Sequence, residues 1–389
     1  METVSITHSF FIIFCGASVL ATLALYGRQP LLLAYIALGA IVGPSGFGLL
    51  NDAALFSDIA HTGILFLLFL LGLDMQPKAL LAVIRNATVV AVISSAIFAG
   101  CGYLIASAFG FNNVESLIIG ATMMFSSTII GIKLLPTTVL HHKHSGELII
   151  GILLLQDLIA IFVLIAIMSG NGGQFQWQPF AKALGFLPLL AGGAFAFVKY
   201  VLLPLLMKFD RFHEYIFLIA LGWCLGMGEL AHYIGLSSEI GAFIAGITLA
   251  TSPISQYIAE HLKPLRDFFL ILFFFALGAG FDLGVLPDIW LPAIILAGVM
   301  LVLKPMTFRY TLGNLSESKK LAWDVGLRLG QISEFSLLVA FLAYEQHMLS
   351  KDASHLVQAT ALITFVLSSY LVIFNCPNPI AVSDKLRRD

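Results

Sequence analysis

The sequence predicts an all-α polytopic membrane protein with about thirteen transmembrane helices arranged in two inverted repeats. Three observations support this prediction: an apolar composition, a one-sided distribution of basic residues, and a weak internal similarity. The 389 residues are 59% hydrophobic and only 11% charged, and their mean hydropathy is +0.97. A soluble protein is about 25% charged. This composition excludes a disordered chain, a nucleic-acid-binding protein and an ordinary soluble enzyme.

The membrane spans are predicted from apolar stretches that are separated by polar, proline or glycine residues. A helix needs about 20 predominantly apolar residues to cross the hydrocarbon core of a bilayer. We expect spans at 8–26, 30–50, 56–74, 87–109, 114–134, 146–168, 180–206, 213–233, 236–251, 266–283, 287–306, 320–343 and 355–375.

The basic residues predict the orientation, because Lys and Arg accumulate on the cytoplasmic side of membrane proteins. With thirteen spans, the connections on one side collect 16 of the 20 basic residues. The other side has only Lys182 and Lys351, while Lys304 and Arg328 fall inside spans. We therefore expect an external N-terminus and a cytoplasmic C-terminus. The lack of targeting segments favours the inner (cytoplasmic) membrane of a bacterial cell.

The internal similarity predicts an inverted repeat. LAYIALGAIVG (33–43) is similar to GAFIAGITLAT (241–251), and ILFLLFLLGLD (64–74) is similar to LFFFALGAGFD (272–282), both at an offset of 208 residues. These matches relate the second and third spans to the ninth and tenth. Because the shift is seven spans, the two halves cross the membrane in opposite directions. Such repeats are common in secondary transporters, whose binding sites lie near the midplane where helices are broken.

A buried carboxylate is the first candidate for chemistry. The stretch GILLLQDLIAI (151–161) places Gln156 and Asp157 within the sixth span. A charged residue at the centre of a membrane helix costs about 2.5–3.5 kcal/mol on insertion scales. A bound ion or proton would offset this cost, so Asp157 is predicted to bind both, with Gln156 in support.

The fifth and twelfth spans contain segments that are unusual for continuous helices in lipid. FSSTIIGIKLLP (125–136) has three consecutive hydroxyl residues, and GLRLGQISEFSLL (326–338) combines glycines with polar and charged residues. Non-helical backbone at membrane depth is tolerated only where protein or a water-filled cavity surrounds it. We therefore expect helices 5 and 12 to be broken and to cross, with Asp157 facing the crossing. The candidate residues lining the ion path are Ser126, Ser127 and Thr128.

Several of these polar residues also have a purely structural interpretation. The three hydroxyl residues could bond back to their own helix. Lys304 either extends to the cytoplasmic rim or compensates the partial charges of broken helix ends. Arg328 and Glu334 are expected to form a structural ion pair with each other, or with Asp324 or Glu239.

The motifs of soluble catalysis are absent from the sequence. It contains neither the phosphate-binding pattern GxxxxGK[ST] nor the zinc-protease pattern HExxH. We therefore expect no enzyme, no resident metal and no cofactor. Transport would draw on ion gradients, with K⁺ or Na⁺ and H⁺ as the transported species.

The polar motifs together resemble those of a known transporter family. GILLLQDLIAI, SSTIIG, the LGL-D-x-x-P end of the third span (71–77) and GQISEF are similar to the monovalent cation:proton antiporter-2 family. The membrane domain of Kef-type potassium efflux transporters is the most similar group, and the resemblance covers nearly the whole chain. It implies a sodium/proton-antiporter-like fold, with Asp157 as the ion- and proton-binding carboxylate, Gln156 as its neutral neighbour and Lys304 as the basic residue of helix 11.

The resemblance also implies a domain organisation and a homodimer. Helices 1–3 and 8–10 would form a dimerisation scaffold over residues 1–110 and 207–285, with helix 4 beginning near residue 87. Helices 4–6 and 11–13 would form the ion-transporting core over 87–168 and 286–376. Residues 180–206 would be a linker helix, and residues 377–389 a short cytoplasmic tail.

Two departures from Kef-type proteins affect regulation. Those proteins continue into a cytoplasmic nucleotide-binding domain, whereas this sequence ends at Asp389. Its segment SQYIAEHLKPLRD (255–267) is also more basic than their acidic loop. We expect a simple exchanger or one that is regulated by a separate cytoplasmic subunit.

The expected mechanism is alternating access, in which a monovalent cation and a proton compete for Asp157. Gln156 stands where some family members have a second Asp, which predicts electroneutral exchange unless Lys304 also releases a proton. The Gln-Asp pair favours potassium over sodium, although selectivity depends on the number and flexibility of the coordinating oxygens. Two alternatives remain open: a gated cation channel, and a sodium-coupled organic anion symporter.

Overall fold

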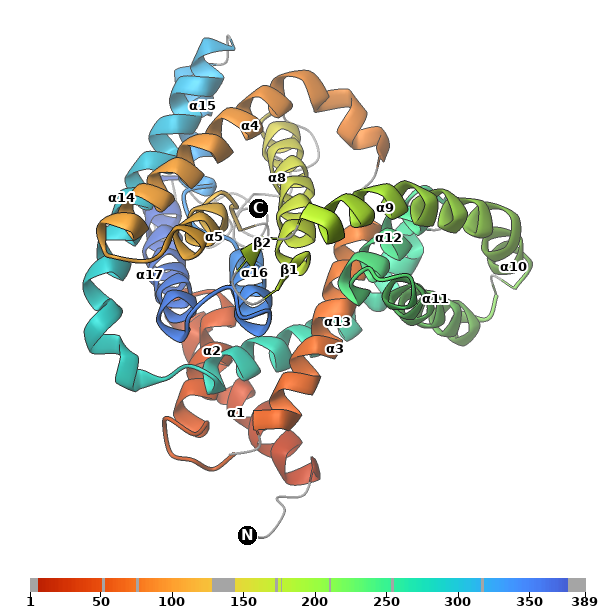
Figure 1. Cartoon of the computed structure of the whole chain (residues 1–389), viewed down its shortest axis with the longest axis horizontal. Helices are drawn as coiled ribbons and strands as arrows, with labels where there is room; N and C mark the ends of the chain where they lie inside the picture. Colours follow the sequence, from red (N-terminus) through yellow and green to blue (C-terminus); the bar gives the residue numbers. More distant parts are fainter. Residues whose placement is uncertain are drawn as a thin grey trace. The chain divides into compact units, whose positions relative to one another are not determined.

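The structure is a computed structural model of the chain, shown in Figure 1. It describes residues 6–50, 53–74, 77–127, 144–171, 174–175, 177–209, 211–252, 255–315 and 318–376. In chain order the elements are α1 (Ile6–Tyr26), α2 (Leu31–Val42), α3 (Ala53–Asp74), α4 (Pro77–Ala108), α5 (Asn113–Met123), α8 (His144–Met168), β1 (Gly170–Asn171), β2 (Gln174–Phe175), α9 (Trp177–Phe197), η1 (Val198–Leu202), α10 (Leu203–Lys208), α11 (His213–Tyr233), α12 (Ser238–Ala250), α13 (Ser255–Ala279), η2 (Leu283–Val285), α14 (Leu286–Asn314), α15 (Lys319–Arg328), α16 (Glu334–Glu345) and α17 (Lys351–Asn375).

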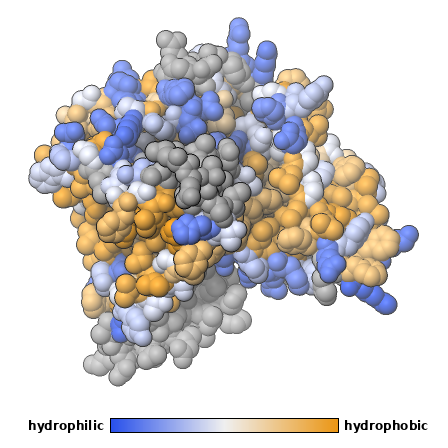
Figure 2. Space-filling model, turned by 90° about the horizontal axis from the view of Figure 1, so that it is seen from below, coloured by the Kyte–Doolittle hydropathy of each residue, from blue (hydrophilic) through white to orange (hydrophobic). Residues whose placement is uncertain are grey.

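The prediction of an all-α polytopic membrane protein is confirmed. Every expected span overlaps at least one helix, and the strands β1 and β2 form only a two-residue antiparallel pair. Among the described residues, seven helices are long and apolar enough to cross a membrane, and three shorter helical stretches are also apolar. Apolar side chains occupy much of the surface in Figure 2, as contact with lipid requires. The count of thirteen crossings and their sidedness stay predictions.

Some helix ends differ from the expected ranges. Helix α4 begins at Pro77 rather than near residue 87, because proline is favourable in the first helical turn and the helix extends through a charged segment. Its residues 87–108 are long and apolar enough to cross a membrane. Helix α2 ends at Val42 rather than near residue 50, where a Gly43-Pro44 turn follows and Gly48 adopts a positive φ of 64°. Hydropathy therefore located the apolar segments but not the true helix ends.

Three helices near the candidate site begin with side-chain caps. Asn112 and Glu115 form a capping box at the start of α5. The Ser333 hydroxyl accepts a hydrogen bond from the Phe335 N–H at the start of α16, at 3.0 Å. Ser350 caps α17, and its own N–H donates to the Glu115 carboxylate at 2.9 Å. These bonds satisfy backbone N–H groups that a helix start leaves without helical partners.

The chain forms two compact units. The first comprises Met1–Ala17, Tyr35–Leu80 and Gln176–Gly280. The second comprises Ser18–Ala34, Leu81–Phe175 and Phe281–Asp389. The second unit contains α5, α8 and α14–α17, which hold the predicted site residues. The proposed roles of scaffold, linker and transporting core for these segments stay predictions.

Two reciprocal helix contacts within the first unit support the repeat. A Cβ atom at Gly39 of α2 would collide with the Phe275 carbonyl of α13, and one at Gly246 of α12 would collide with the Phe69 carbonyl of α3. A two-fold relation between α2–α3 and α12–α13 produces such a pair of contacts. The equivalent glycines are 207 residues apart and the equivalent carbonyls 206, so the offset of 208 was one to two residues too large.

Candidate ion-binding site

Broken backbone occurs where the sequence predicted it. Helix α15 ends at Arg328, α16 begins at Glu334, and residues 329–333 between them are not helical. Helix α5 ends at Met123, and residues 125–127 after it are also non-helical. The rest of the fifth span, including Thr128, lies outside the described residues. We call residues 125–127 the first unwound segment and residues 329–333 the second.

Lys304 of α14 connects the two unwound segments. Its side chain is fully buried, and its Nζ donates to the Phe125 carbonyl at 2.6 Å and to the Gln331 carbonyl at 3.1 Å. A longer contact of 3.4 Å reaches the Ser126 hydroxyl, and Nζ also lies 5.2 Å from the centre of the Phe98 ring. This position excludes the interpretation in which Lys304 extends to the cytoplasmic rim.

Ser126 ties the first unwound segment to two other elements. Its hydroxyl donates to the Leu329 carbonyl at 2.9 Å, so it bonds across the crossing rather than to its own helix. Its backbone N–H donates to the Gln156 Oε1 of α8 at 3.0 Å. Ser127 is fully buried beside it. The first unwound segment is therefore held by α8 and by the second unwound segment.

The Gln-Asp pair lies on α8 next to this crossing. Gln156 and Asp157 are 1% and 4% exposed. The Ser126 N–H can only donate, so it fixes the orientation of the Gln156 amide with its oxygen toward the backbone. The Gln156 Nε2 has no hydrogen-bond partner among the described residues. The like-charged carboxylate of Glu334, the first residue of α16, acts electrostatically on Asp157.

Arg328 has a structural partner. Its Nε lies 3.2 Å from the Asp324 Oδ2 one helical turn earlier in α15, while the Arg328 side chain is only 1% exposed. One of the expected pairings is therefore present. Arg328 is the last residue of α15, and a positive charge is favourable at a helix C-terminus.

Sequence reasoning missed the contribution of α17. Thr364 Oγ1 accepts a hydrogen bond from the Ile332 N–H at 3.2 Å, and the Ser368 hydroxyl donates to the Gln331 Oε1 at 2.8 Å. Gln331 was noted only as part of the unusual twelfth span. The detectable signal was the spacing of Thr360, Thr364 and Ser368, which puts three hydroxyl groups on one face of an apolar helix.

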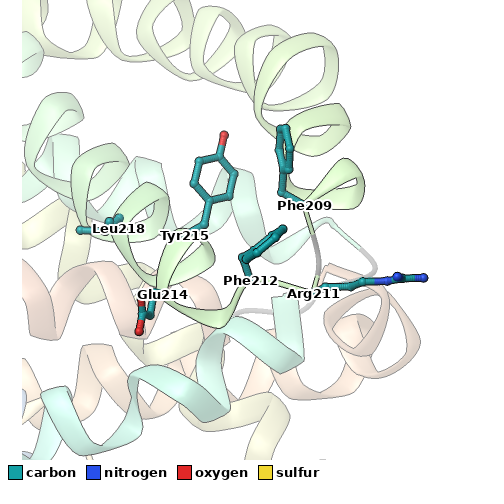
Figure 3. Close-up of a pocket in the computed structure, with 6 residues that line it drawn as sticks. All are labelled: Phe209, Arg211, Phe212, Glu214, Tyr215 and Leu218. Carbon is teal, nitrogen blue, oxygen red and sulfur yellow. The ribbon is translucent and has the colours of Figure 1, made fainter.

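A pocket of about 670 Å³ adjoins the α10–α11 connection and does not involve these residues. Figure 3 shows three aromatic rings grouped there, with the charged side chains directed away from them. The rings of Phe209 and Tyr215 are 5.2 Å apart. Because none of the predicted ion-binding residues lines this pocket, it does not mark the transport site. Its lining residues are Phe209, Arg211, Phe212, Glu214, Tyr215 and Leu218.

Comparison with known proteins shows the family. Residues 10–373 match the transmembrane sodium/hydrogen exchanger family. K(+) efflux antiporter 4 of Arabidopsis thaliana is 28% identical over 353 residues, which cover 88% of this chain and 59% of that protein. The putative cation/proton antiporter YbaL of Escherichia coli (strain K12) is 27% identical over 371 residues, which cover 91% of this chain and 66% of that protein. The chain thus spans about three fifths to two thirds of the length of these relatives.

A solved structure shows the same fold. The sodium proton antiporter MjNhaP1 from Methanocaldococcus jannaschii at pH 8 has a TM-score of 0.71 to this chain, with 16% sequence identity, and the match covers 94% of this chain and 95% of that one. At this identity the likeness concerns the fold alone.

The chain belongs to the sodium/hydrogen exchanger family. It is a multi-pass membrane protein of a family of secondary transporters that exchange monovalent cations for protons. The resemblance to potassium efflux transporters inferred from the Gln-Asp pair and GQISEF is confirmed.

Proposed function

We propose that this protein exchanges one monovalent cation for one proton by alternating access, with both ligands competing for Asp157. The observation that carries the proposal is the position of this buried carboxylate on α8, directly after the residue that holds the first unwound segment. Unwound backbone supplies carbonyl oxygens, which together with a carboxylate can replace the hydration shell of a cation. When the cation leaves, a proton neutralises Asp157 and removes the cost of an isolated buried charge.

The charge balance of the site favours electroneutral exchange. Gln156 cannot ionise, so Asp157 is the single acidic residue of the pair. The proposal has Lys304 keep its proton, because three oxygen acceptors and an aromatic ring surround its amino group. One proton would then be exchanged for one cation. Potassium is the favoured substrate because the chain is similar to K(+) efflux antiporters.

Further parts of the proposal concern the assembly and its membrane. The first compact unit contains most of the helices assigned to the scaffold, and the second contains those assigned to the core. This division supports a homodimer in which the first unit supplies the interface. The basic residues support an external N-terminus and a cytoplasmic C-terminus in the inner membrane. Regulation by a separate cytoplasmic subunit stays an expectation.

The proposal is tested with purified protein in liposomes that contain a pH-sensitive dye. Potassium or sodium is added at several pH values while the membrane potential is clamped. Proton movement that follows the cation and disappears in Asp157→Asn supports competition for this carboxylate. Asp288→Asn, the same change at an exposed position of α14, serves as the matched control.

Other outcomes would point to other transporters. Undiminished exchange by Asp157→Asn would remove the central role of Asp157. Cation currents that persist without a proton gradient would indicate a channel, and a requirement for an added organic anion would indicate a symporter. An exchange rate that changes when the clamp is released would contradict electroneutrality.

A further inference from the structure

Helix α17 contains five buried hydroxyl residues, and they do not all bond alike. Thr360 donates to the Leu356 carbonyl at 2.7 Å, and Ser369 donates to the Phe365 carbonyl at 2.8 Å. Both bonds stay within α17, which is the usual arrangement for Ser and Thr in a membrane helix. Ser368 instead donates outside its helix, to the second unwound segment.

The partner of Ser368 is the fully buried side-chain amide of Gln331, which links the two unwound segments. Gln331 belongs to the second unwound segment, and its Nε2 faces the Ser127 carbonyl of the first at 3.4 Å. A carbonyl can only accept, so the NH₂ group must face Ser127 and the Oε1 is left to Ser368. The Ser368 bond, at 2.8 Å the shorter of the two, thereby fixes the orientation of the amide.

Thr364 holds the same segment one helical turn away. Its hydroxyl donates to the Ala361 carbonyl of α17 at 2.9 Å and accepts from the Ile332 N–H at 3.2 Å. The two contacts place α17 against consecutive residues of the unwound backbone. Gln331 therefore has a fixed backbone, a fixed amide orientation and a direct contact with the Ser127 carbonyl.

We propose that Ser368 and Gln331 are positioning residues that hold the Ser127 carbonyl as a ligand for the transported monovalent cation. This inference rests on the proposed function of Asp157. Selectivity among alkali cations depends on the number and flexibility of coordinating oxygens. Loss of the Ser368 bond frees the Gln331 amide to rotate and leaves the Ser127 carbonyl less constrained. Cation affinity and the preference between potassium and sodium then change, while the carboxylate chemistry stays intact.

The adjacent serines of α17 provide a matched test. Ser368→Ala and Ser369→Ala remove the same atom from residues that are 1% and 2% exposed, but only the first breaks a bond to a side chain of the second unwound segment. We expect Ser368→Ala to raise the cation concentration for half-maximal exchange by about three- to tenfold, the factor that one neutral buried hydrogen bond supplies. The potassium-to-sodium ratio of these concentrations should also change. Ser369→Ala should stay within about twofold of wild type.

A binding measurement separates this inference from the proposed function. The unfolding midpoint of purified protein is measured in increasing KCl or NaCl, with choline chloride keeping the ionic strength constant, because a ligand that binds the folded state raises this midpoint. Cation-dependent stabilisation absent from Asp157→Asn establishes the site itself. Ser368→Ala should then need higher cation concentrations for the same shift. Equal behaviour of Ser368→Ala and Ser369→Ala would overturn the inference while leaving the Asp157 site in place.

Two further variants keep the inference testable if Ser368→Ala folds poorly. Ser368→Thr retains the hydroxyl and should restore affinity to within about twofold of wild type. Gln331→Met has a similar length but no hydrogen-bonding groups, and it should reproduce the loss. A Ser368→Thr variant that is as impaired as Gln331→Met would contradict a role for the hydroxyl.

Discussion

The Gln156 amide oxygen on α8 accepts a hydrogen bond from the Ser126 backbone N–H at 3.0 Å. This bond joins the helix that carries Asp157 to a segment whose backbone has left the helical conformation. An unwound N–H at this depth has neither water nor a helical carbonyl as its partner. Gln156 thus supplies a hydrogen-bond acceptor for the Ser126 N–H, which an apolar side chain could not do.

Replacing Gln156 with leucine should destabilise the protein. The Ser126 N–H would be left buried without an acceptor, at a cost of about 1–3 kcal/mol in the free energy of unfolding. Thermal unfolding in detergent measures the loss. Gln358→Leu is the matched control, because its amide contacts the side chains of Ser354, at 3.3 Å, and His355 in its own helix rather than an unwound N–H, and its loss should be at most about 1 kcal/mol. Equal losses in both variants would indicate that the Ser126 bond contributes little.

Lys304 and Phe98 should be energetically coupled. The ammonium lies 5.2 Å from the centre of the Phe98 ring in a fully buried setting. A desolvated cation–π contact is worth about 2 kcal/mol. We expect Lys304→Met and Phe98→Leu each to lower the unfolding midpoint, and the double variant to lose about 2 kcal/mol less than the sum of the two single losses. Additive losses would show that the ring does not stabilise the ammonium. Lys319→Met, at an exposed position, controls for the loss of a basic residue.

Conspicuous polar residues made part of this site predictable from sequence. Asp157 and the Arg-Gly-Gln-Ser-Glu pattern of the twelfth span attract attention because charge and glycine are costly in an apolar helix. The location of the break in that span was correct for the same reason.

Ser368 could not be identified in this way. A serine in a membrane helix ordinarily bonds to its own backbone, and Ser369 beside it does so. Only the packing of α17 against the second unwound segment distinguishes these two residues. The position of Lys304 was likewise undetermined, because a long lysine near a helix end can reach either the rim or the interior. Three-dimensional packing decides such cases, and hydropathy does not report it.

An ion pair between two partly exposed side chains, Asp282 and Lys351, predicts a pH dependence of stability. Asp282 precedes α14, and its carboxylate accepts hydrogen bonds from Lys351 Nζ at 2.5 Å and from the Gly284 N–H at 2.8 Å. The Lys351 bond first, and the Gly284 bond second, hold the pKa of the Asp282 carboxyl below its ordinary value. A lowered folded-state pKa gives stability that is fully present above the ordinary value and is lost as the pH falls through the lowered one.

Wild type should therefore exceed Asp282→Asn in unfolding midpoint at neutral pH, and the difference should shrink below about pH 4. Thermal unfolding between pH 7 and pH 3 checks this expectation. Asp288→Asn, at an exposed position in the first turn of α14, controls for the loss of one carboxylate. A difference between wild type and Asp282→Asn that persists unchanged to pH 3 would contradict the pairing.

The reciprocal glycine contacts predict that two distant substitutions have similar effects. Gly39→Ala and Gly246→Ala each place a Cβ atom against the backbone of a neighbouring helix, at Phe275 in the first case and at Phe69 in the second. The backbone atoms of the neighbouring helix cannot move aside as the end of a flexible side chain can. Each change should therefore lower the free energy of unfolding by about 1–3 kcal/mol. Because the repeat gives both glycines the same environment, the two losses should be similar.

Gly226→Ala provides the comparison, because a Cβ atom there meets no atom of a neighbouring helix within 4 Å. In an open helical position alanine is favoured over glycine by up to about 1 kcal/mol, so this variant should be neutral or slightly stabilised. Thermal unfolding of the three variants in one detergent separates close packing from the general effect of removing a glycine. If Gly246→Ala were as stable as Gly226→Ala while Gly39→Ala was not, the contact of α12 with α3 would not be equivalent to that of α2 with α13. The two-fold relation inferred for the first unit would then fail at this position.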